Sequence, residues 1–309
     1  MRLLLGTEAL ALGAMDGGAR FYAGHPLQAS AEIDRALLQA LPERGGTAVL
    51  VEDESAALAA TLGAGAGGLL GVTATNAAGL AVAGPLLEHA VAARIPALLA
   101  VVGSPADSRP EPAGPARIPR IETASQRELG PLRWCAPGGV PLPVYAPASA
   151  GECYALARAA AREAMTRRGP VVLYVDHVIG HLREPVDEGV SDPAPEGAES
   201  FRVRDAVVLV VAVGIVARAA RSAVRLARDR GVRAGLFRPV RLWPFPEPAL
   251  LEAASGVRRV IVAELNEGQM VDVVRAALAE LDPRPRVRPL TGAPMLEPDR
   301  IAAAFEESA

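Results

Sequence analysis

The sequence has little cysteine, no long apolar run and no large excess of charge of one sign. Its two cysteines, Cys135 and Cys153, are too few for a disulfide scaffold or an iron–sulfur cluster, which usually takes four thiolates. No stretch reaches the roughly 18 uninterrupted apolar residues of a membrane span. The net charge is −3 and the basic residues are scattered along the chain, so neither nucleic acid nor a membrane surface is expected as a partner. We expect a reduced, cytoplasmic protein.

Several familiar catalytic motifs are also absent. The chain has no G-x-x-x-x-G-K-[ST] and no G-x-S-x-G, and the strand–turn–helix pattern at 212–220, "AVGIVARAA", is not G-x-G-x-x-G. The four histidines, His25, His89, His177 and His181, show no metal-ligand spacing, and we interpret them as ordinary polar residues. No local motif decides the chemistry alone.

Hydrophobic runs alternate with helical patterns along the chain. The runs are rich in Val and Leu without strict alternation, which is typical of strands covered on both faces of a parallel sheet. The predicted strands are 47–52, 69–75, 96–104, 170–176, 206–214, 233–240 and 258–266. The predicted helices are 30–41, 54–64, 79–93, 150–167, 216–230 and 268–281. This order predicts an α/β fold with two doubly wound parallel-sheet domains.

A change of composition divides the chain. The stretch near 181–205 is acidic, rich in proline and without periodicity, as linkers are. We therefore predict a first domain at 1–182, a linker at 183–204 and a second domain at 205–309. A proline-rich loop at 103–120 is either a binding or docking segment or disordered.

An acidic cluster stands where a predicted strand passes into a helix. Residues 48–57 read "AVLVEDESAA", in which the three acidic residues Glu52, Asp53 and Glu54 follow one another. Acidic side chains in a first helical turn complement the helix dipole and can cap free N–H groups. The other interpretation is a carboxylate that contacts a cofactor.

Further motifs, in their order, resemble the α subunits of the 2-oxoacid:ferredoxin oxidoreductases. Members show G-N-E-A, Y-P-I-T-P-S-S-E, E-D-E-x-A-A, G-A-x-x-A-G, T-x-T-S-G-P-G and an I-P strand. This chain has "GTEALALGAMDGGARFYAGHPLQASAEI", "VEDESAALAATLGAGAGG", "VTATNAAGL" and "ARIPALLAVV". In the second half, "LWPFPEPALLEA" and "VIVAELNEGQMVDVVR" resemble the family's P-F-P and V-x-V-x-E-x-N-x-G-Q-L segments.

The resemblance implies a thiamine diphosphate enzyme that converts a 2-oxoacid to an acyl-CoA by oxidative decarboxylation, with ferredoxin as electron acceptor. The fold would be a pyrimidine-type cofactor domain followed by a domain like the C-terminal domain of transketolase. In the family a separate β subunit supplies the diphosphate and Mg²⁺ half-site and the iron–sulfur cluster. The absence here of a G-D-G…N motif and of cluster cysteines agrees with such a hetero-oligomer.

The resemblance also assigns roles to the acidic cluster and its surroundings. The family's Glu at the position of Glu54 hydrogen-bonds the cofactor's aminopyrimidine ring and favours its imino tautomer. Helix capping is the alternative for Glu54, and capping or surface roles are expected for Glu52 and Asp53. Further cofactor contacts are expected from His25, Pro26, Thr75 and Asn76.

Three departures from the family concern substrate binding. Gln28 stands where the family has a substrate-contacting Thr, and Asn76 replaces a Ser. Gly103 stands where many members have an Arg that binds the substrate carboxylate, and such a charge-assisted contact contributes ~1.5–3 kcal/mol. Arg109 is the candidate replacement. We therefore expect Gln28, Asn76 and Arg109 to bind substrate.

Two other functions stay open. One is half of a non-oxidative thiamine diphosphate decarboxylase or lyase, and the other is a non-catalytic scaffold subunit. Trp134 and Trp243 are interpreted as core or interface anchors. A polar group after the last long strand either contacts a ligand or partner or, as we favour, caps a helix and docks the domains; it comprises Glu264, Asn266, Gly268 and Gln269.

Overall fold

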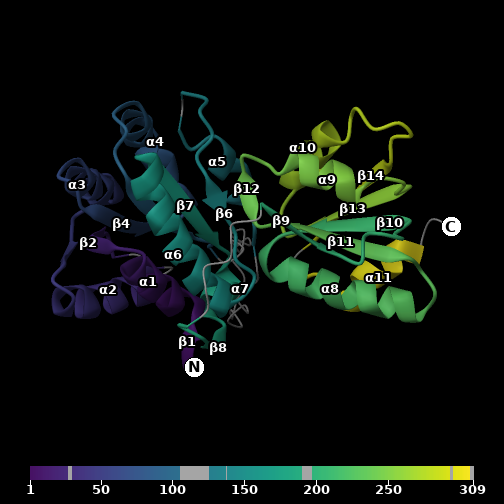
Figure 1. The fold of residues 1–309 in the computed structure, drawn as a ribbon, viewed down its shortest axis with the longest axis horizontal. Coiled ribbons are helices and arrows are strands. Elements are labelled where there is room, and N and C mark those ends of the chain that lie inside the picture. Colours follow the sequence, from purple (N-terminus) through teal and green to yellow (C-terminus); the bar gives the residue numbers. More distant parts are fainter. Residues whose placement is uncertain (27–29, 105–124, 137, 190–196, 293–294, 307–309) are drawn as a thin grey trace, which may run out of the picture.

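The computed structural model of the chain describes residues 1–26, 30–104, 125–136, 138–189, 197–292 and 295–306. Figure 1 shows two lobes side by side, each a β-sheet with helices on both faces. The N-terminus lies at the lower end of the first lobe and the C-terminus at the far end of the second. Within these residues, no helix combines the length and apolarity needed to cross a membrane.

The first lobe is built on a seven-stranded sheet with the order β12-β6-β7-β5-β4-β2-β3. All neighbouring pairs are parallel except β12 with β6. The strands are β2 (Ala19–Gly24), β3 (Thr47–Leu50), β4 (Leu70–Thr75), β5 (Ala97–Val102), β6 (Val144–Tyr145), β7 (Pro170–Val175) and β12 (Arg241–Trp243). Strands β4, β5 and β7 are buried along their whole length, as central strands of a parallel sheet are.

Helices cover both faces of this sheet. One face carries α1 (Gly6–Asp16), α2 (Ala31–Glu43) and α6 (Ala150–Arg167), whose buried side chains form one apolar cluster. The other carries α3 (Glu54–Ala66), α4 (Ala77–Ala92) and the short α5 (Leu129–Arg133). Helix α1 lies so close to α6 that a side chain at Gly13 would collide with the carbonyl of Tyr154, and glycine alone permits such an approach.

The second lobe has a five-stranded sheet with the order β14-β13-β10-β11-β9, of which only β9 is antiparallel to its neighbour. Its strands are β9 (Ala198–Phe201), β10 (Val208–Ala212), β11 (Ala234–Pro239), β13 (Arg259–Glu264) and β14 (Arg286–Thr291). Helices α8 (Gly214–Asp229) and α11 (Pro298–Glu306) cover one face, and α9 (Glu247–Ala253) and α10 (Gln269–Ala277) cover the other. A separate ribbon pairs β1 (Arg2–Leu5) with β8 (Arg183–Val186), and α7 (His177–His181) precedes β8.

The predicted fold class is confirmed, with one antiparallel edge strand added to each sheet. Each of the seven predicted strands and six predicted helices has a counterpart in the structure. The segment 183–204, predicted as a linker, contains the short strands β8 and β9. Strand β8 pairs with β1 in the two-stranded ribbon, and β9 pairs at the edge of the second sheet. Such short strands need backbone partners but no hydrophobic pattern. Strand β12 lies in the first sheet although it follows the second lobe's β11 in the chain.

The lobes meet through an apolar contact and an ionic one. One apolar cluster runs from Leu87 on α4 through Leu132 and Trp243 to Met270 on α10. Elsewhere Arg238 of β11 binds Glu152 of α6 through two hydrogen bonds of 2.7 and 2.9 Å. Charge and apolar packing thus both join the two sheets.

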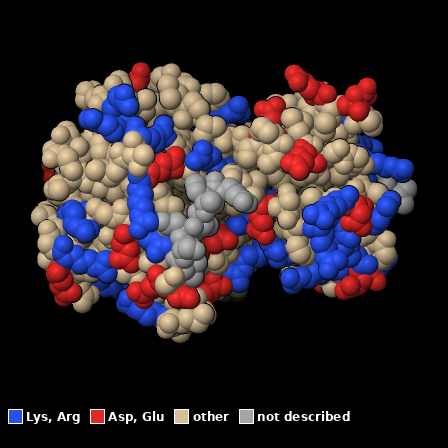
Figure 2. Space-filling model, viewed as in Figure 1, with Lys and Arg blue, Asp and Glu red and all other residues tan. Residues whose placement is uncertain are grey.

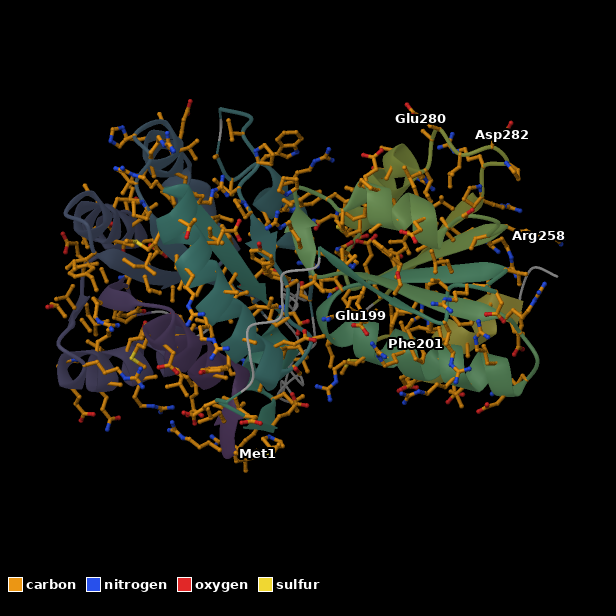
Figure 3. The ribbon with its side chains drawn as sticks, in the orientation of Figure 1. Met1, Glu199, Phe201, Arg258, Glu280 and Asp282 are labelled. Atoms are coloured by element: carbon orange, nitrogen blue, oxygen red, sulfur yellow. The ribbon has the colours of Figure 1, made fainter. Side chains whose placement is uncertain are left out.

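Arginines that are scattered in the sequence gather on the second lobe. Figure 2 shows them together over its lower face, where α8 lies. Three guanidinium groups, from Arg202, Arg221 and Arg225, lie 4.6–5.7 Å from the ring of Phe201. Arg221 also pairs with Glu199, which Figure 3 shows beside Phe201 on β9. The ring and the carboxylate hold these charges close together.

Candidate active site

The carboxyl ends of three neighbouring strands form the candidate site. Strand β2 lies between β3 and β4, and the chain leaves β2 into α2 on one face and leaves β3 into α3 on the other. The strand ends at such a reversal are the usual ligand site of an open α/β sheet. His25, the acidic cluster and Thr75 follow β2, β3 and β4, and they therefore share this edge.

Glu54 is the first residue of α3, and its neighbour does the capping. The carboxylate of Asp53 accepts a hydrogen bond of 2.7 Å from the backbone N–H of Ala56. Glu52 is exposed. The prediction that Asp53 caps the helix is confirmed. Glu54 is half-buried, and no described residue hydrogen-bonds its carboxylate, so this acidic group remains available to a ligand.

The start of α4 packs directly against Glu54. The side chain of Asn76 caps α4 by accepting hydrogen bonds from the N–H groups of Ala78 (3.0 Å) and Gly79 (3.1 Å). Thr75 is buried. A side chain at Gly79 would collide with the hydroxyl of Thr75 and would come within 2.8 Å of Cγ of Glu54. Thr75, Asn76 and Glu54 therefore lie together, and their binding roles remain predictions. Asn76 also has a capping role that the sequence analysis did not assign.

His25 joins β2 to the segment that carries the acidic cluster. Its Nδ1 lies 3.3 Å from the carbonyl oxygen of Val51, whose N–H donates to Gly24 at 2.9 Å. Pro26 follows and is exposed. Two other predicted site residues, Gln28 and Arg109, lie outside the described residues. Their roles remain predictions.

A buried polar pair beneath β2 was not predicted. The hydroxyl of the fully buried Tyr22 donates a hydrogen bond to the carboxylate of Asp34 on α2, which is 7% exposed. Burial raises the pKa of both groups. The signal in the sequence was an acid on the apolar face of α2, between Ile33 and Leu37, where an aliphatic residue is expected.

A second group of acids lies at the ends of β5 and β7. Glu128 accepts hydrogen bonds from Ser104 N–H (3.0 Å) and from the hydroxyl of Tyr174 (3.4 Å), and burial raises its pKa. Asp176 caps α7, accepts from Ile215 N–H at 2.7 Å, and has its pKa raised to about 6 by burial. These contacts fix the two strand ends and the start of α8.

Gly103 lies close to the elements around it. A Cβ there would come within 3.1 Å of the backbone nitrogen of His177 and 3.4 Å of the hydroxyl of Tyr174. A larger residue would therefore require the backbone at His177 to move by a few tenths of an ångström. The site is therefore built without a side chain at 103.

The polar group after β13 is fully used for capping and docking. The carboxylate of Glu264 accepts from the N–H groups of Met270 and Val271, and Asn266 Oδ1 accepts from Gly268 and Gln269. The side chain of Gln269 accepts from Gly130 N–H at 2.8 Å, and Asn266 Nδ2 donates to Gln126 at 3.1 Å. These bonds cross between the lobes, so the capping and docking interpretation is confirmed.

The tryptophans differ in environment. Trp243 is buried in the apolar cluster between the lobes, as a core anchor should be. Trp134 is 61% exposed, and the guanidinium of Arg133 lies 4.8 Å from its ring and 5.3 Å from that of Trp243. An interface role for Trp134 remains a prediction.

Family models match nearly the whole chain. Residues 12–204 match the thiamine diphosphate-binding domain of the pyruvate flavodoxin/ferredoxin oxidoreductases, and residues 206–293 match core domain II of pyruvate:ferredoxin oxidoreductase. Among curated relatives, the 2-oxoglutarate synthase subunit KorA of Methanothermobacter marburgensis is 29% identical, with 96% of each chain covered. The ketoisovalerate oxidoreductase subunit VorB of Methanothermobacter thermautotrophicus is 28% identical, with 89% of each covered.

Two solved structures share the fold. A 2-oxoglutarate:ferredoxin oxidoreductase from Magnetococcus marinus aligns with a TM-score of 0.85 and 20% identity over 99% of this chain and 65% of that chain. A split-gene transketolase aligns with a TM-score of 0.66 and 20% identity over 98% and 95%. With both family models matched in order, this chain belongs to the 2-oxoacid:ferredoxin oxidoreductases and is an α subunit of that enzyme family.

Proposed function

We propose that this chain works with a β subunit to decarboxylate a 2-oxoacid oxidatively, with thiamine diphosphate as cofactor, coenzyme A as acyl acceptor and ferredoxin as electron acceptor. The observation that carries the proposal is the position of Glu54. Glu54 is half-buried and lies beside Gly79 at the ends of β3 and β4, while Asp53 takes over helix capping. If Glu54 were a capping residue, its carboxylate would accept a hydrogen bond from a backbone N–H group.

The residues present fit the aminopyrimidine end of the cofactor. When bound, thiamine diphosphate supplies a carbanion and an electron sink for decarboxylation. The role of this chain is to hold a carboxylic acid against a nitrogen of the aminopyrimidine ring. This requires a partly buried position for the acid, where the interaction is strong. Glu54 supplies the acid, and Gly79 lets the start of α4 pack closely against the Glu54 side chain. We also propose cofactor contacts by His25, Pro26, Thr75 and Asn76, and substrate contacts by Gln28, Asn76 and Arg109.

The surface of α3 and α4 supports a partner subunit. Helix α3 has one charged residue, Glu54, and α4 has one, Glu88. Both helices nevertheless lie at the surface: Val82 of α4 is 60% exposed, and Leu69 in the turn after α3 is 49% exposed. A helix that is apolar all round is normally buried. We propose that the β subunit covers this surface and brings the diphosphate, Mg²⁺ and iron–sulfur sites.

The compounds named for the relatives suggest a 2-oxoacid substrate of the 2-oxoglutarate or branched-chain type. No comparison favours a non-oxidative lyase or a scaffold subunit. The division into domains 1–182 and 205–309, with 183–204 between them, also remains a proposal. Two free, buried cysteines, Cys135 and Cys153, suit the reducing cytoplasm that we propose as its location.

Reconstitution tests the proposal. The isolated chain is titrated with thiamine diphosphate and Mg²⁺ in a calorimeter, alone and together with its β subunit. We expect binding only with the β subunit, and only then 2-oxoacid-dependent and coenzyme A-dependent reduction of ferredoxin. Micromolar binding to the isolated chain, or stoichiometric iron in it, would contradict the division of the site between two subunits.

A further inference from the structure

Trp134 turns a large aromatic ring to the solvent between buried neighbours. The residue is 61% exposed, whereas Leu132 before it is fully buried and Cys135 after it is 7% exposed. The backbone N–H of Trp134 donates a hydrogen bond of 3.1 Å to the carbonyl of Pro131. The chain is therefore packed against the core on both sides of Trp134, and only the indole ring points outward.

Arg133 holds this ring in place. Its guanidinium lies over two indole rings, 4.8 Å from the centre of Trp134 and 5.3 Å from the centre of Trp243. Trp243 is 4% exposed and belongs to the apolar cluster that joins the lobes. A cation over an aromatic face is an attractive contact. Arg133 thus links the exposed ring to the core, and a ring that is already ordered loses less entropy when a partner binds it.

The segment that carries Trp134 lies against the last turns of α4. A Cβ at Gly138 would come within 3.1 Å of Oε1 of Glu88, and Figure 1 shows the chain after α5 beside α4. Exposed residues of α4 recur at spacings of three and four, which places them on one face of the helix. This outer face of α4 comprises Ala78, Val82, Pro85 and Glu88.

The outer face of α4 joins Trp134 to the candidate cofactor site. Helix α4 starts at the carboxyl end of β4, where Asn76, Gly79 and Glu54 lie together. Single exposed apolar residues are normal, but a continuous exposed apolar surface marks a site of interaction. Trp and Arg are also the residue types most enriched among interface hot spots. The curated relatives are named as subunits, so a second chain is the expected occupant.

We propose that Trp134, held by Arg133, anchors the contact with the β subunit, and that this contact follows the outer face of α4 from Glu54 to the ring. The matching surface would have an apolar pocket for the indole ring and hydrogen-bond acceptors at its rim for the guanidinium. The inference rests on the proposed function, because it takes the β subunit as the partner. A second copy of this chain is the alternative occupant, and the test separates the two.

Fluorine NMR of the chain labelled with 5-fluorotryptophan observes its two tryptophans separately, and Trp134→Phe assigns the signals. In the free chain the Trp134 signal should shift between H₂O and D₂O, and that of the buried Trp243 should not. Addition of the unlabelled β subunit should abolish the solvent effect at Trp134. A ring that stays exposed in the complex would overturn the proposal. Protection that grows with the concentration of the free chain would also overturn it, by assigning the ring to a second copy.

Affinity gives an independent readout. In calorimetric titration with the β subunit, Trp134→Ala should weaken binding at least about tenfold, as expected for a hot spot. Val82→Glu, which leaves Trp134 and the core intact, should weaken binding by a similar factor. Leu3→Ala is the control, since Leu3 is 59% exposed on β1, at the other end of the lobe from α4, and should change affinity less than about twofold. Thermal unfolding should be unchanged in all three. Equal affinities of the wild type and Trp134→Ala would contradict the anchor role.

Ferredoxin reduction by the same complexes separates this inference from the proposed function. If the wild-type complex is active while Trp134 stays exposed in it, the proposed function stands and the role of Trp134 falls. If the complex protects Trp134 but shows no 2-oxoacid-dependent activity, the docking surface stands and the proposed function falls.

Discussion

The adjacent acids Asp53 and Glu54 have different roles at the start of α3. At a helix start the side chain of the N-cap residue points back to the free N–H groups, and that of the first helical residue points away from them. Asp53 occupies the first position and bonds Ala56. Glu54 occupies the second and lies against Gly79. A difference of one position at the helix start thus determines which acid caps the helix and which is available to bind a cofactor.

Asp176 gives folding a pH dependence of definite sign. Burial raises the pKa of this carboxyl from its ordinary 3.8 to about 6. Between about pH 4 and pH 6 the folded chain therefore binds more protons at this site than the unfolded chain, and the free energy of unfolding falls as the pH rises. The two pKa values differ by the equivalent of about 3 kcal/mol.

We expect Asp176→Asn to remove this part of the slope. The variant should be less stable at every pH, because it loses an acceptor for a buried N–H, but its stability should fall less between pH 4 and pH 6. Urea unfolding across this range measures the difference. Asp205→Asn is the control of opposite sign, since Arg228 lowers the pKa of the exposed Asp205. A wild type that loses no more stability than Asp176→Asn in this window would contradict the account.

At the scale of elements, the contact between α3 and α4 controls the place of Glu54. The two helices start from adjacent strand ends, and Gly79 lets the first turn of α4 lie against the Glu54 side chain. Any Cβ here must push against Thr75 or Glu54. Gly63, on the outer side of α3, has nothing within 4 Å of a Cβ.

These two glycines make a matched pair of variants. Gly79→Ala should displace the Glu54 carboxylate, lower the activity of the complex at least tenfold and destabilise the chain by about 1–3 kcal/mol through overpacking. Gly63→Ala should raise the isolated chain's stability by up to about 1 kcal/mol, because alanine restricts the unfolded chain. Thermal unfolding and ferredoxin reduction measure both. Equal effects of the two substitutions would rule out the packing argument.

The elements also show what the sequence could predict. Long buried strands such as β5 and β7 were found because their Val and Leu runs leave no other interpretation. Strand β2, "ARFYAG", was missed because its glycine and arginine break the apolar run, and β12 was missed because three residues carry no period. The site residues after β3 and β4 were placed through family resemblance. The pair of Tyr22 with Asp34 was not found, since it depends on how α2 packs on β2.

At the scale of the whole molecule, the two lobes are joined by charge as well as by apolar packing. Arg238 is nearly buried and binds Glu152 of the first lobe and Glu199 of its own. Arg230 makes similar pairs at the surface, with Glu306 and Asp299. Removing a buried charge leaves its partners poorly solvated, whereas a surface pair contributes little.

We therefore expect Arg238→Ala to destabilise the chain by about 2–4 kcal/mol. This loss is smaller than that for a fully buried ion pair, because Glu152 and Glu199 are partly exposed. Arg230→Ala should change stability by less than about 1 kcal/mol. Chemical denaturation gives both values. If the two variants lost similar stability, the contact of Arg238 with Glu152 would contribute no more to joining the lobes than a surface ion pair does.

The central claim is that Glu54 activates the cofactor, and one measurement tests it most directly: turnover of the reconstituted complex with Glu54→Gln. Gln keeps the size of Glu but cannot supply the acidic proton, so we predict a loss of about 10²–10⁴-fold or more in kcat with the unfolding midpoint unchanged. Glu52→Gln, at an exposed position, should keep near-normal activity. A Glu54→Gln complex with more than about a tenth of wild-type activity would contradict the account.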